Sequence, residues 1–174
     1  MIEKTVVIRR WIAILFIIYL FYLIWAVLFK FSFSYADIPF RRRYVNLDLF
    51  FNPSGSVLSP IIVREKVMNL LIFIPFGAYL YMLGSTRFVP SFLIMLCTSL
   101  LFETIQYAFV LGTSDIADVA TNALGGIIGF LLMNLTFRLS KRKDGMLLHF
   151  AILAGITTVV VILGTIWLKL TYGG

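Results

Sequence analysis

The sequence is poor in the residues on which most soluble catalytic and metal sites depend. It has one cysteine, one histidine and only eight acidic residues among 174. A single cysteine, Cys97, excludes an intramolecular disulfide. His149 has no Cys, Asp or Glu at ligand spacing, and no Ser-His or Cys-His arrangement occurs. Familiar hydrolase chemistry therefore lacks its base, and we assign no catalytic residue.

Apolar residues take the place of the missing polar ones. The chain is 61% hydrophobic and 13% charged, with a mean hydropathy of +1.00. These values exclude an ordinary soluble domain, and apolar runs as long as a bilayer is thick recur along the chain. We expect an all-α, polytopic membrane helix bundle that forms one domain over residues 1–174. The net charge of +7 indicates loops against anionic headgroups, so the expected partner is the lipid bilayer and not nucleic acid.

The hydropathy pattern predicts five transmembrane helices. They cover residues of about 11–29, 67–83, 88–111, 116–137 and 146–168. Lys4, Arg9 and Arg10 precede the first run as in a signal peptide, but the run is too long and lacks a small-residue cleavage site. We therefore interpret it as a retained first span.

The segment from Lys30 to Lys66 is the one long hydrophilic connection of the sequence. It contains Arg41, Arg42 and Arg43, followed by the aromatic patch 49–51. Two interpretations remain open for it. It rests in the headgroup layer, as mixed arginines and aromatic residues suggest, or it is a solvated surface loop.

Basic residues favour one orientation of the bundle. The N-terminus and the loop Arg138–Gly145 fall on the same side of a five-span protein and are dense in Lys and Arg. Because such segments stay in the cytoplasm, we predict the N-terminus inside and the C-terminus outside, with an extracytoplasmic first loop.

Polar residues gather in the otherwise apolar stretch Ser99–Gly129. They are Glu103, Gln106, Asp115, Asp118 and Asn122. An ionisable group at membrane depth costs about 2.5–3.5 kcal/mol, so such groups persist when they face one another, water or a ligand. Steps of three and four place them on one face of each of two helices, and the short connection 112–114 makes these helices antiparallel. We predict one outward-facing polar pocket, with Asn69 at the first turn of the second span as a further member.

The contents of this pocket stay open at the level of sequence. Protonation could relieve the repulsion among the carboxylates, or a divalent cation could be held by Glu103, Asp115 and Asp118. An arginine from Arg41–Arg43 could also pair with them. The structural alternative is a buried hydrogen-bond network that only locks two helices together.

Proline and glycine mark the expected packing contacts. Pro75 should bend the second span, and Gly77 should admit a close neighbour. Gly125 and Gly129 form a stripe of small residues on the fourth span, where two helices can pack backbone to backbone.

Three motifs over Val67–Leu132 resemble the VanZ-like family of bacterial membrane proteins. They are N-x5-P-F-G from Asn69, E-x-x-Q from Glu103, and D-I-x-D-x3-N-x2-G-x3-G from Asp115. The resemblance implies a multi-pass protein of the bacterial cytoplasmic membrane with an accessory role in resistance to the glycopeptide teicoplanin. Family members often carry an arginine just before the first aspartate, whereas this chain has Gly-Thr-Ser there.

Three functions are compatible with these features. The first is an accessory envelope and glycopeptide-resistance factor whose pocket binds a lipid-linked precursor or a lipophilic glycopeptide (lipoglycopeptide). The second is a divalent-cation-dependent membrane enzyme acting on a phosphate-bearing lipid. The third is a small transporter or flippase, which the bend at Pro75 favours and the lack of an internal repeat disfavours. We place the binding protein first.

Overall fold

The computed structural model describes residues 2–29, 45–46, 60–84, 87–111, 114–139 and 146–172. These residues form five helices and two very short strands. In chain order the elements are α1 (Ile2–Leu28), β1 (Val45–Asn46), α2 (Pro60–Leu83), α3 (Phe88–Phe109), β2 (Ser114–Asp115), α4 (Ile116–Leu139) and α5 (Met146–Tyr172). The prediction of an all-α helical bundle is confirmed.

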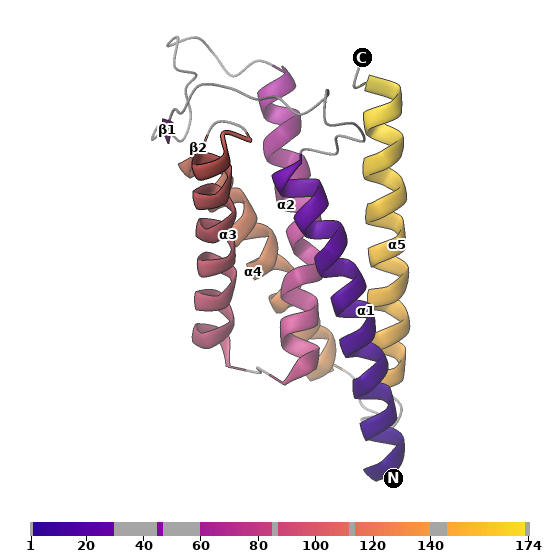
Figure 1. The fold of residues 1–174 in the computed structure, drawn as a ribbon. Coiled ribbons are helices and arrows are strands. Elements are labelled where there is room, and N and C mark those ends of the chain that lie inside the picture. The colour runs from indigo at the N-terminus through magenta and orange to yellow at the C-terminus, as the bar shows by residue number, and fades with distance from the viewer. Residues whose placement is uncertain are drawn as a thin grey trace.

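The helices run up and down, so that successive helices point in opposite directions (Figure 1). The N-terminus and the C-terminus lie at opposite ends of the bundle, as an odd number of crossings requires. Helices α2 and α4 make the most extensive contact in the bundle. Helix α3 packs on α4, while α1 and α5 pack against α2 and against each other.

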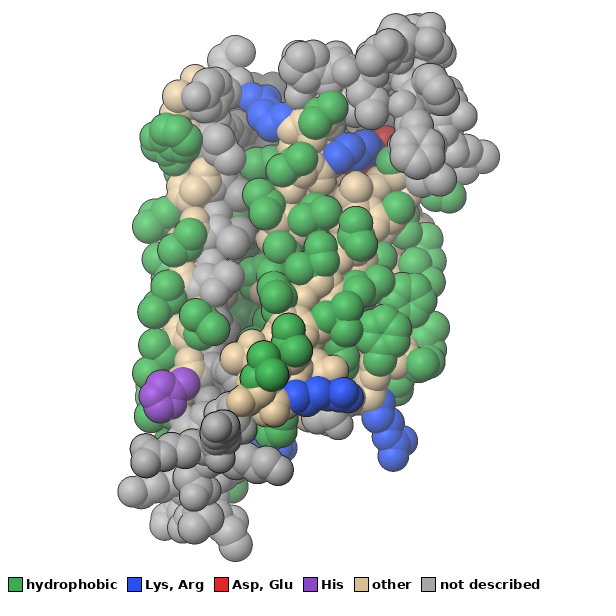
Figure 2. All heavy atoms as spheres, turned by 180° about the vertical axis from the view of Figure 1, so that it is seen from behind, with side chains coloured by type: hydrophobic (Ala, Val, Ile, Leu, Met, Phe, Trp, Pro, Cys, Tyr) green, Lys and Arg blue, Asp and Glu red, His purple; other side chains and the backbone are tan. Residues whose placement is uncertain are grey.

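Four of the helices are long and apolar enough to cross a membrane. They are Val6–Leu28, Val63–Leu83, Phe88–Phe109 and Ile116–Leu139, and α5 contains the apolar stretch Ala151–Gly164. Figure 2 shows a broad hydrophobic surface between Lys and Arg side chains near the two ends of the molecule. The chain is therefore a membrane protein.

The observed helix bounds correct the expected spans at several ends. Helix α1 begins at Ile2 rather than near residue 11. Helix α2 begins at Pro60 rather than Val67, since proline is well suited to the first helical position. Lys66 therefore belongs to a helix and not to the preceding connection. Helix α3 ends at Phe109 because Val110 takes a left-handed conformation with φ of 58°.

Glycines allow α2 and α4 to approach each other closely. A Cβ atom on Gly77 would overlap the backbone carbonyl of Gly126, and one on Gly129 would overlap the carbonyl of Ile74. A Cβ atom on Gly125 would meet the carbonyl of Leu70 in the same way. The packing expected from the glycine stripe and from Gly77 thus lies at one crossing, between α2 and α4.

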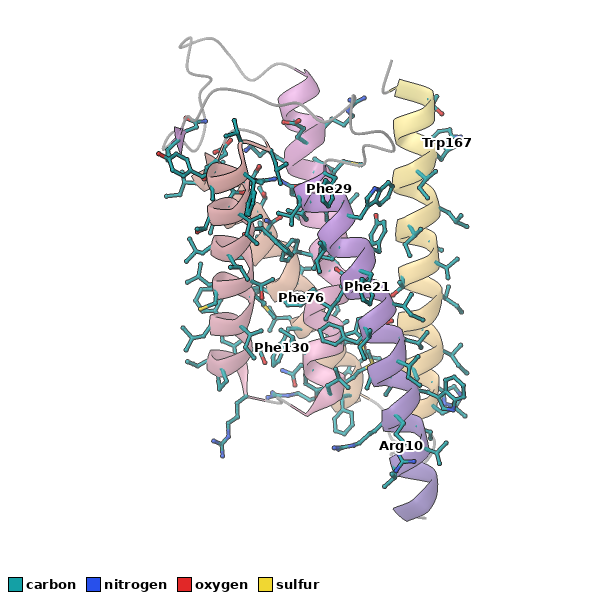
Figure 3. All side chains as sticks on the ribbon, viewed as in Figure 1. Arg10, Phe21, Phe29, Phe76, Phe130 and Trp167 are labelled. Carbon is teal, nitrogen blue, oxygen red and sulfur yellow. The ribbon has the colours of Figure 1, made fainter. Side chains whose placement is uncertain are left out.

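Aromatic side chains fill the space between α1 and α2. Figure 3 shows Phe76 and Phe130 within the bundle, and Phe76 lies 5.9 Å from Phe16 between ring centroids. The hydroxyl of Tyr19 donates a hydrogen bond to the carbonyl of Ile72, one turn before Pro75. Because proline disturbs the carbonyls of the preceding turn, this contact attaches α1 to α2 where its backbone lacks regular hydrogen bonds.

Enlarging a glycine at the α2–α4 crossing should destabilise the protein. We expect Gly77→Ala and Gly129→Ala each to lower the free energy of unfolding by about 1–3 kcal/mol, because the added methyl group meets backbone atoms that cannot move aside. Gly164→Ala on α5 is the matched control, since nothing lies within 4 Å of its Cβ position. Unfolding in detergent micelles measures all three, and equal losses would contradict this packing.

The orientation of the bundle can be tested at the turn between α3 and α4, which lies at the same end as the C-terminus (Figure 1). We predict this end outside. A cysteine introduced at Thr113, with Cys97 replaced by serine, should react with an impermeant thiol reagent in intact cells. Protection in intact cells, followed by labelling after lysis, would reverse the orientation.

Candidate functional site

The polar residues of four elements meet at the end of the bundle that also carries the C-terminus. The second turn of α2, the first turns of α4, the strand β2 and the last two turns of α3 lie together there (Figure 1). Four of these residues are buried, with 6% or less of the whole residue exposed: Glu103, Gln106, Asp118 and Asn122. We call these four, together with Lys66 and Asp115, the polar cluster.

Lys66 pairs with both aspartates of the polar cluster. Its Nζ atom lies 2.5 Å from Asp115 Oδ2 and 2.7 Å from Asp118 Oδ1. The side chains of Lys66 and Asp115 are 17% and 16% exposed, and that of Asp118 is 9% exposed. Two aspartates can therefore lie side by side at the membrane boundary because one ammonium group lies within hydrogen-bond distance of both.

Asp115 joins three helices through its side chain and its backbone. Its Oδ1 atom accepts a hydrogen bond of 2.8 Å from the backbone N–H of Ala117, which caps the start of α4. Its own backbone N–H donates to Glu103 Oε2 on α3, also at 2.8 Å. Carboxylates at a helix N-terminus are further favoured by the helix dipole. Asp115 thus connects α4 to α3 directly and to α2 through Lys66.

Two buried amide side chains lie one turn to either side of these contacts, Asn122 toward the middle of the bundle and Gln106 toward its end. Asn122 donates to the hydroxyl of Ser99 at 2.9 Å, which ties α4 to α3. Gln106 donates to the carbonyl of Val27 at 2.8 Å. That carbonyl belongs to the last turn of α1, where backbone acceptors have no partner within the helix. Ser99 was not among the residues predicted from the sequence.

The same two amides carry acceptor atoms that the cluster leaves open. Within the described part of the chain, Gln106 Oε1 and Asn122 Oδ1 are buried without a hydrogen-bond partner. Gln106 is 1% exposed and Asn122 is fully buried. A buried acceptor of this kind costs about 1–3 kcal/mol when it receives no donor, so the interior of the cluster favours a donor group.

A short strand pair brings the long connection to the polar cluster. β1 pairs with β2 in parallel, with Val45 opposite Ser114 and Asn46 opposite Asp115. The left-handed turn at Val110 ends α3, and the N–H of Leu111 bonds back to the carbonyl of Gln106 at 3.0 Å. The chain then returns over Glu103 to begin α4. Two paired residues are too few to leave a periodic signal in the sequence.

The structure brings five of the predicted polar residues together: Glu103, Gln106, Asp115, Asp118 and Asn122. Asn69 lies half-buried on α2, one turn beyond Lys66, and makes no side-chain hydrogen bond within the described residues. Arg41, Arg42 and Arg43 lie outside the described residues.

Lys66 is the member of the polar cluster that sequence reasoning missed. It was assigned to the end of the hydrophilic connection, because hydropathy places the start of the second span after the charged run 64–66. Pro60 was the available signal, since proline often opens a helix. A lysine before an apolar run is so common at membrane interfaces that it does not by itself point to a site.

The described residues include no group of three or more His, Cys, Asp or Glu side chains that could hold a metal ion. The cation hypothesis named Glu103, Asp115 and Asp118 as its ligands. In the structure the ammonium group of Lys66 lies between two of these carboxylates. The ammonium group thus takes the place that a divalent cation would need between these two aspartates.

The fold and the polar cluster define a class: a multi-pass helical membrane protein with a charged network at one end of its bundle. Comparison with known proteins identifies the family within this class. The family model VanZ/LLP1 matches residues 16–138. Protein VanZ of Enterococcus faecium is 38% identical over 128 residues, which is 72% of this chain and 75% of that protein. The chain belongs to the VanZ/LLP1 family, and the resemblance drawn from the motifs is confirmed.

The family match covers more of the bundle than the motifs did. It begins within α1 and ends in the last turn of α4, so it includes Lys66 and every other member of the polar cluster. Helix α5 lies beyond it. No solved structure matches the chain.

The ion pair between Lys66 and Asp118 should contribute measurably to stability. We predict a coupling free energy of about 1–3 kcal/mol in a double-mutant cycle of Lys66→Met and Asp118→Asn, because removing either partner leaves the other in a mostly buried place. The free energy of unfolding in micelles measures it.

An exposed pair on α4 provides the control for this cycle. Arg138 donates to Asn134 at 3.2 Å on the surface, and such pairs contribute about 0–1 kcal/mol. A coupling free energy between Lys66 and Asp118 no larger than that between Arg138 and Asn134 would show that the ion pair does not stabilise the contact between α2 and α4.

Proposed function

We propose that this protein is an accessory factor of the bacterial envelope that raises tolerance to teicoplanin-type, lipophilic glycopeptides. In this proposal the polar cluster faces the outside of the cytoplasmic membrane and binds a lipid-linked or lipophilic ligand. Membership of the VanZ/LLP1 family and the similarity to Protein VanZ support the resistance role.

The observation that carries the binding role is the partial exposure of one end of a buried charged network. Lys66 and Asp115 reach the surface of the described residues, whereas Glu103, Gln106, Asp118 and Asn122 lie behind them. A network that only locked helices together could be replaced by well-packed apolar residues at little cost in stability, so charged groups at its mouth support a binding role. A ligand headgroup at the membrane surface would meet Lys66 and Asp115 first.

The exposed face of α3 beside the polar cluster is apolar, as expected of a face in contact with lipid. Helix α3 turns one face to α4 through Met95, Ser99, Phe102 and Glu103, while Leu100, Leu101 and Tyr107 on its other face are exposed. A lipophilic ligand could therefore keep its apolar part in the bilayer and its polar part at the cluster. A large apolar and a small polar contact area is typical of sites for amphiphilic ligands.

Susceptibility of a sensitive bacterium that expresses the protein tests this proposal. Wild-type protein should raise the inhibitory concentration of teicoplanin, and Glu103→Gln and Asp118→Asn should abolish this protection at equal membrane abundance. Thr104→Val is the matched control, because Thr104 lies beside Glu103 but bonds only to Leu100 of its own helix on the exposed face. Unchanged protection in the acidic variants would reject the polar cluster as the functional site.

A further inference from the structure

We propose that the space between Asp115 and Asp118 is a binding site for a primary ammonium group, which Lys66 occupies in this structure and which a ligand amine can take in its place. This inference rests on the proposed function, since it names the chemical group through which the ligand would be recognised. The ligand class is an amphiphile or small molecule that carries a protonated primary amine.

The geometry around Lys66 already shows how an ammonium group is held. Nζ lies 2.5 Å from Asp115 Oδ2 and 2.7 Å from Asp118 Oδ1, both within the range of charge-assisted hydrogen bonds. The other oxygen of Asp115, Oδ1, accepts a hydrogen bond from the backbone N–H of Ala117, which fixes the carboxylate in place. Another ammonium group at the position of Nζ would find the same two oxygens at the same distances.

The atoms around this space are mainly acceptors. Asp115, Asp118 and Glu103 offer carboxylate oxygens, and Gln106 Oε1 and Asn122 Oδ1 are buried acceptors with no partner among the described residues. These two amides lie one turn from Glu103 and Asp118 on the inner faces of α3 and α4. Carboxylate oxygens on both sides of the space accept N–H donors and repel a phosphate group, and the buried amide oxygens one turn away likewise accept only from donors, so the site favours an amine.

Lys66 is suited to give up its place. Its ammonium sits on a flexible four-carbon stem, and its side chain is 17% exposed at the mouth of the polar cluster. Withdrawal of Nζ toward the headgroup layer would keep the charge solvated, as lysine side chains do near the ends of membrane helices. An incoming amine would then reach the two oxygens that Nζ had contacted, on the side where Asp115 is 16% exposed.

The first test restores the missing ammonium group to a shortened side chain. Lys66→Ala removes the atoms of n-propylamine, so propylammonium should raise the thermal midpoint of the purified variant by about 2–4 °C near saturation. Tetramethylammonium at equal ionic strength has no N–H group and should not do so. The double variant Lys66→Ala with Asp118→Asn should lose the effect. Equal shifts with both cations would overturn the proposal.

The second test uses the wild-type protein and does not depend on folding of the variant. Short-chain phosphatidylethanolamine and phosphatidylcholine differ only at the headgroup nitrogen, which carries three hydrogens in the first lipid and three methyl groups in the second. Calorimetric titration in micelles should show at least tenfold tighter binding of dihexanoyl phosphatidylethanolamine. Titration with free ethanolamine distinguishes the source of the amine. Binding as tight as that of the phosphatidylethanolamine identifies a soluble amine as the ligand, and weaker binding identifies an amphiphile. Equal affinity for the two lipids would contradict an amine-selective site.

The two proposals fail in different experiments. Amine-selective binding without any change in glycopeptide susceptibility would keep the ammonium site and reject the resistance role. Protection against teicoplanin that depends on Asp118, together with equal affinity for the two lipids, would keep the resistance role and reject the ammonium site.

Discussion

The contact of one lysine with two aspartates holds together the end of the bundle where the polar residues lie. Without Lys66 Nζ between them, Asp115 and Asp118 would carry like charges side by side at the membrane boundary. With it, the second turn of α2 is joined to the start of α4, and the backbone N–H of Asp115 extends the connection to Glu103 on α3. Glu103 and Gln106 share one face of α3, and the amide of Gln106 reaches the last turn of α1. Polar contacts therefore connect all four helices at this end of the bundle, mostly through buried side chains.

The polar cluster depends on close packing deeper in the membrane. Lys66 can reach both aspartates only if α2 and α4 approach each other, and the glycines at their crossing permit this approach. Gly77 and Gly129 each lie against backbone atoms of the opposite helix, where any side chain would force the helices apart. Such small-residue contacts are a general means of associating helices in lipid, where burial of apolar surface supplies little driving force. The glycines and the charged residues of the family motifs thus serve the same helix pair.

The sequence was sufficient to predict the helices and the polar face of α3 and α4. Long apolar runs predicted the bundle, and steps of three and four residues predicted one polar face on each of α3 and α4. Glu103 and Asn122 make side-chain contacts between these two helices or with β2 between them, whereas the amide of Gln106 reaches α1. Lys66 was missed because hydropathy marks where a helix becomes apolar, not where it begins, and α2 begins at Pro60. The pairing of Val45–Asn46 with Ser114–Asp115 was missed because it joins two residues to two others across a large sequence separation. Both omissions concern how distant segments meet, which local patterns do not encode.

The position of the Lys66 ammonium group is the most direct test of this explanation. An experimental density map of the protein in nanodiscs should place Nζ within about 3 Å of a carboxylate oxygen of both Asp115 and Asp118, the range of charge-assisted hydrogen bonds. A map in which Lys66 extends into the headgroup layer, with the two aspartates paired to a metal ion or to other side chains, would contradict it.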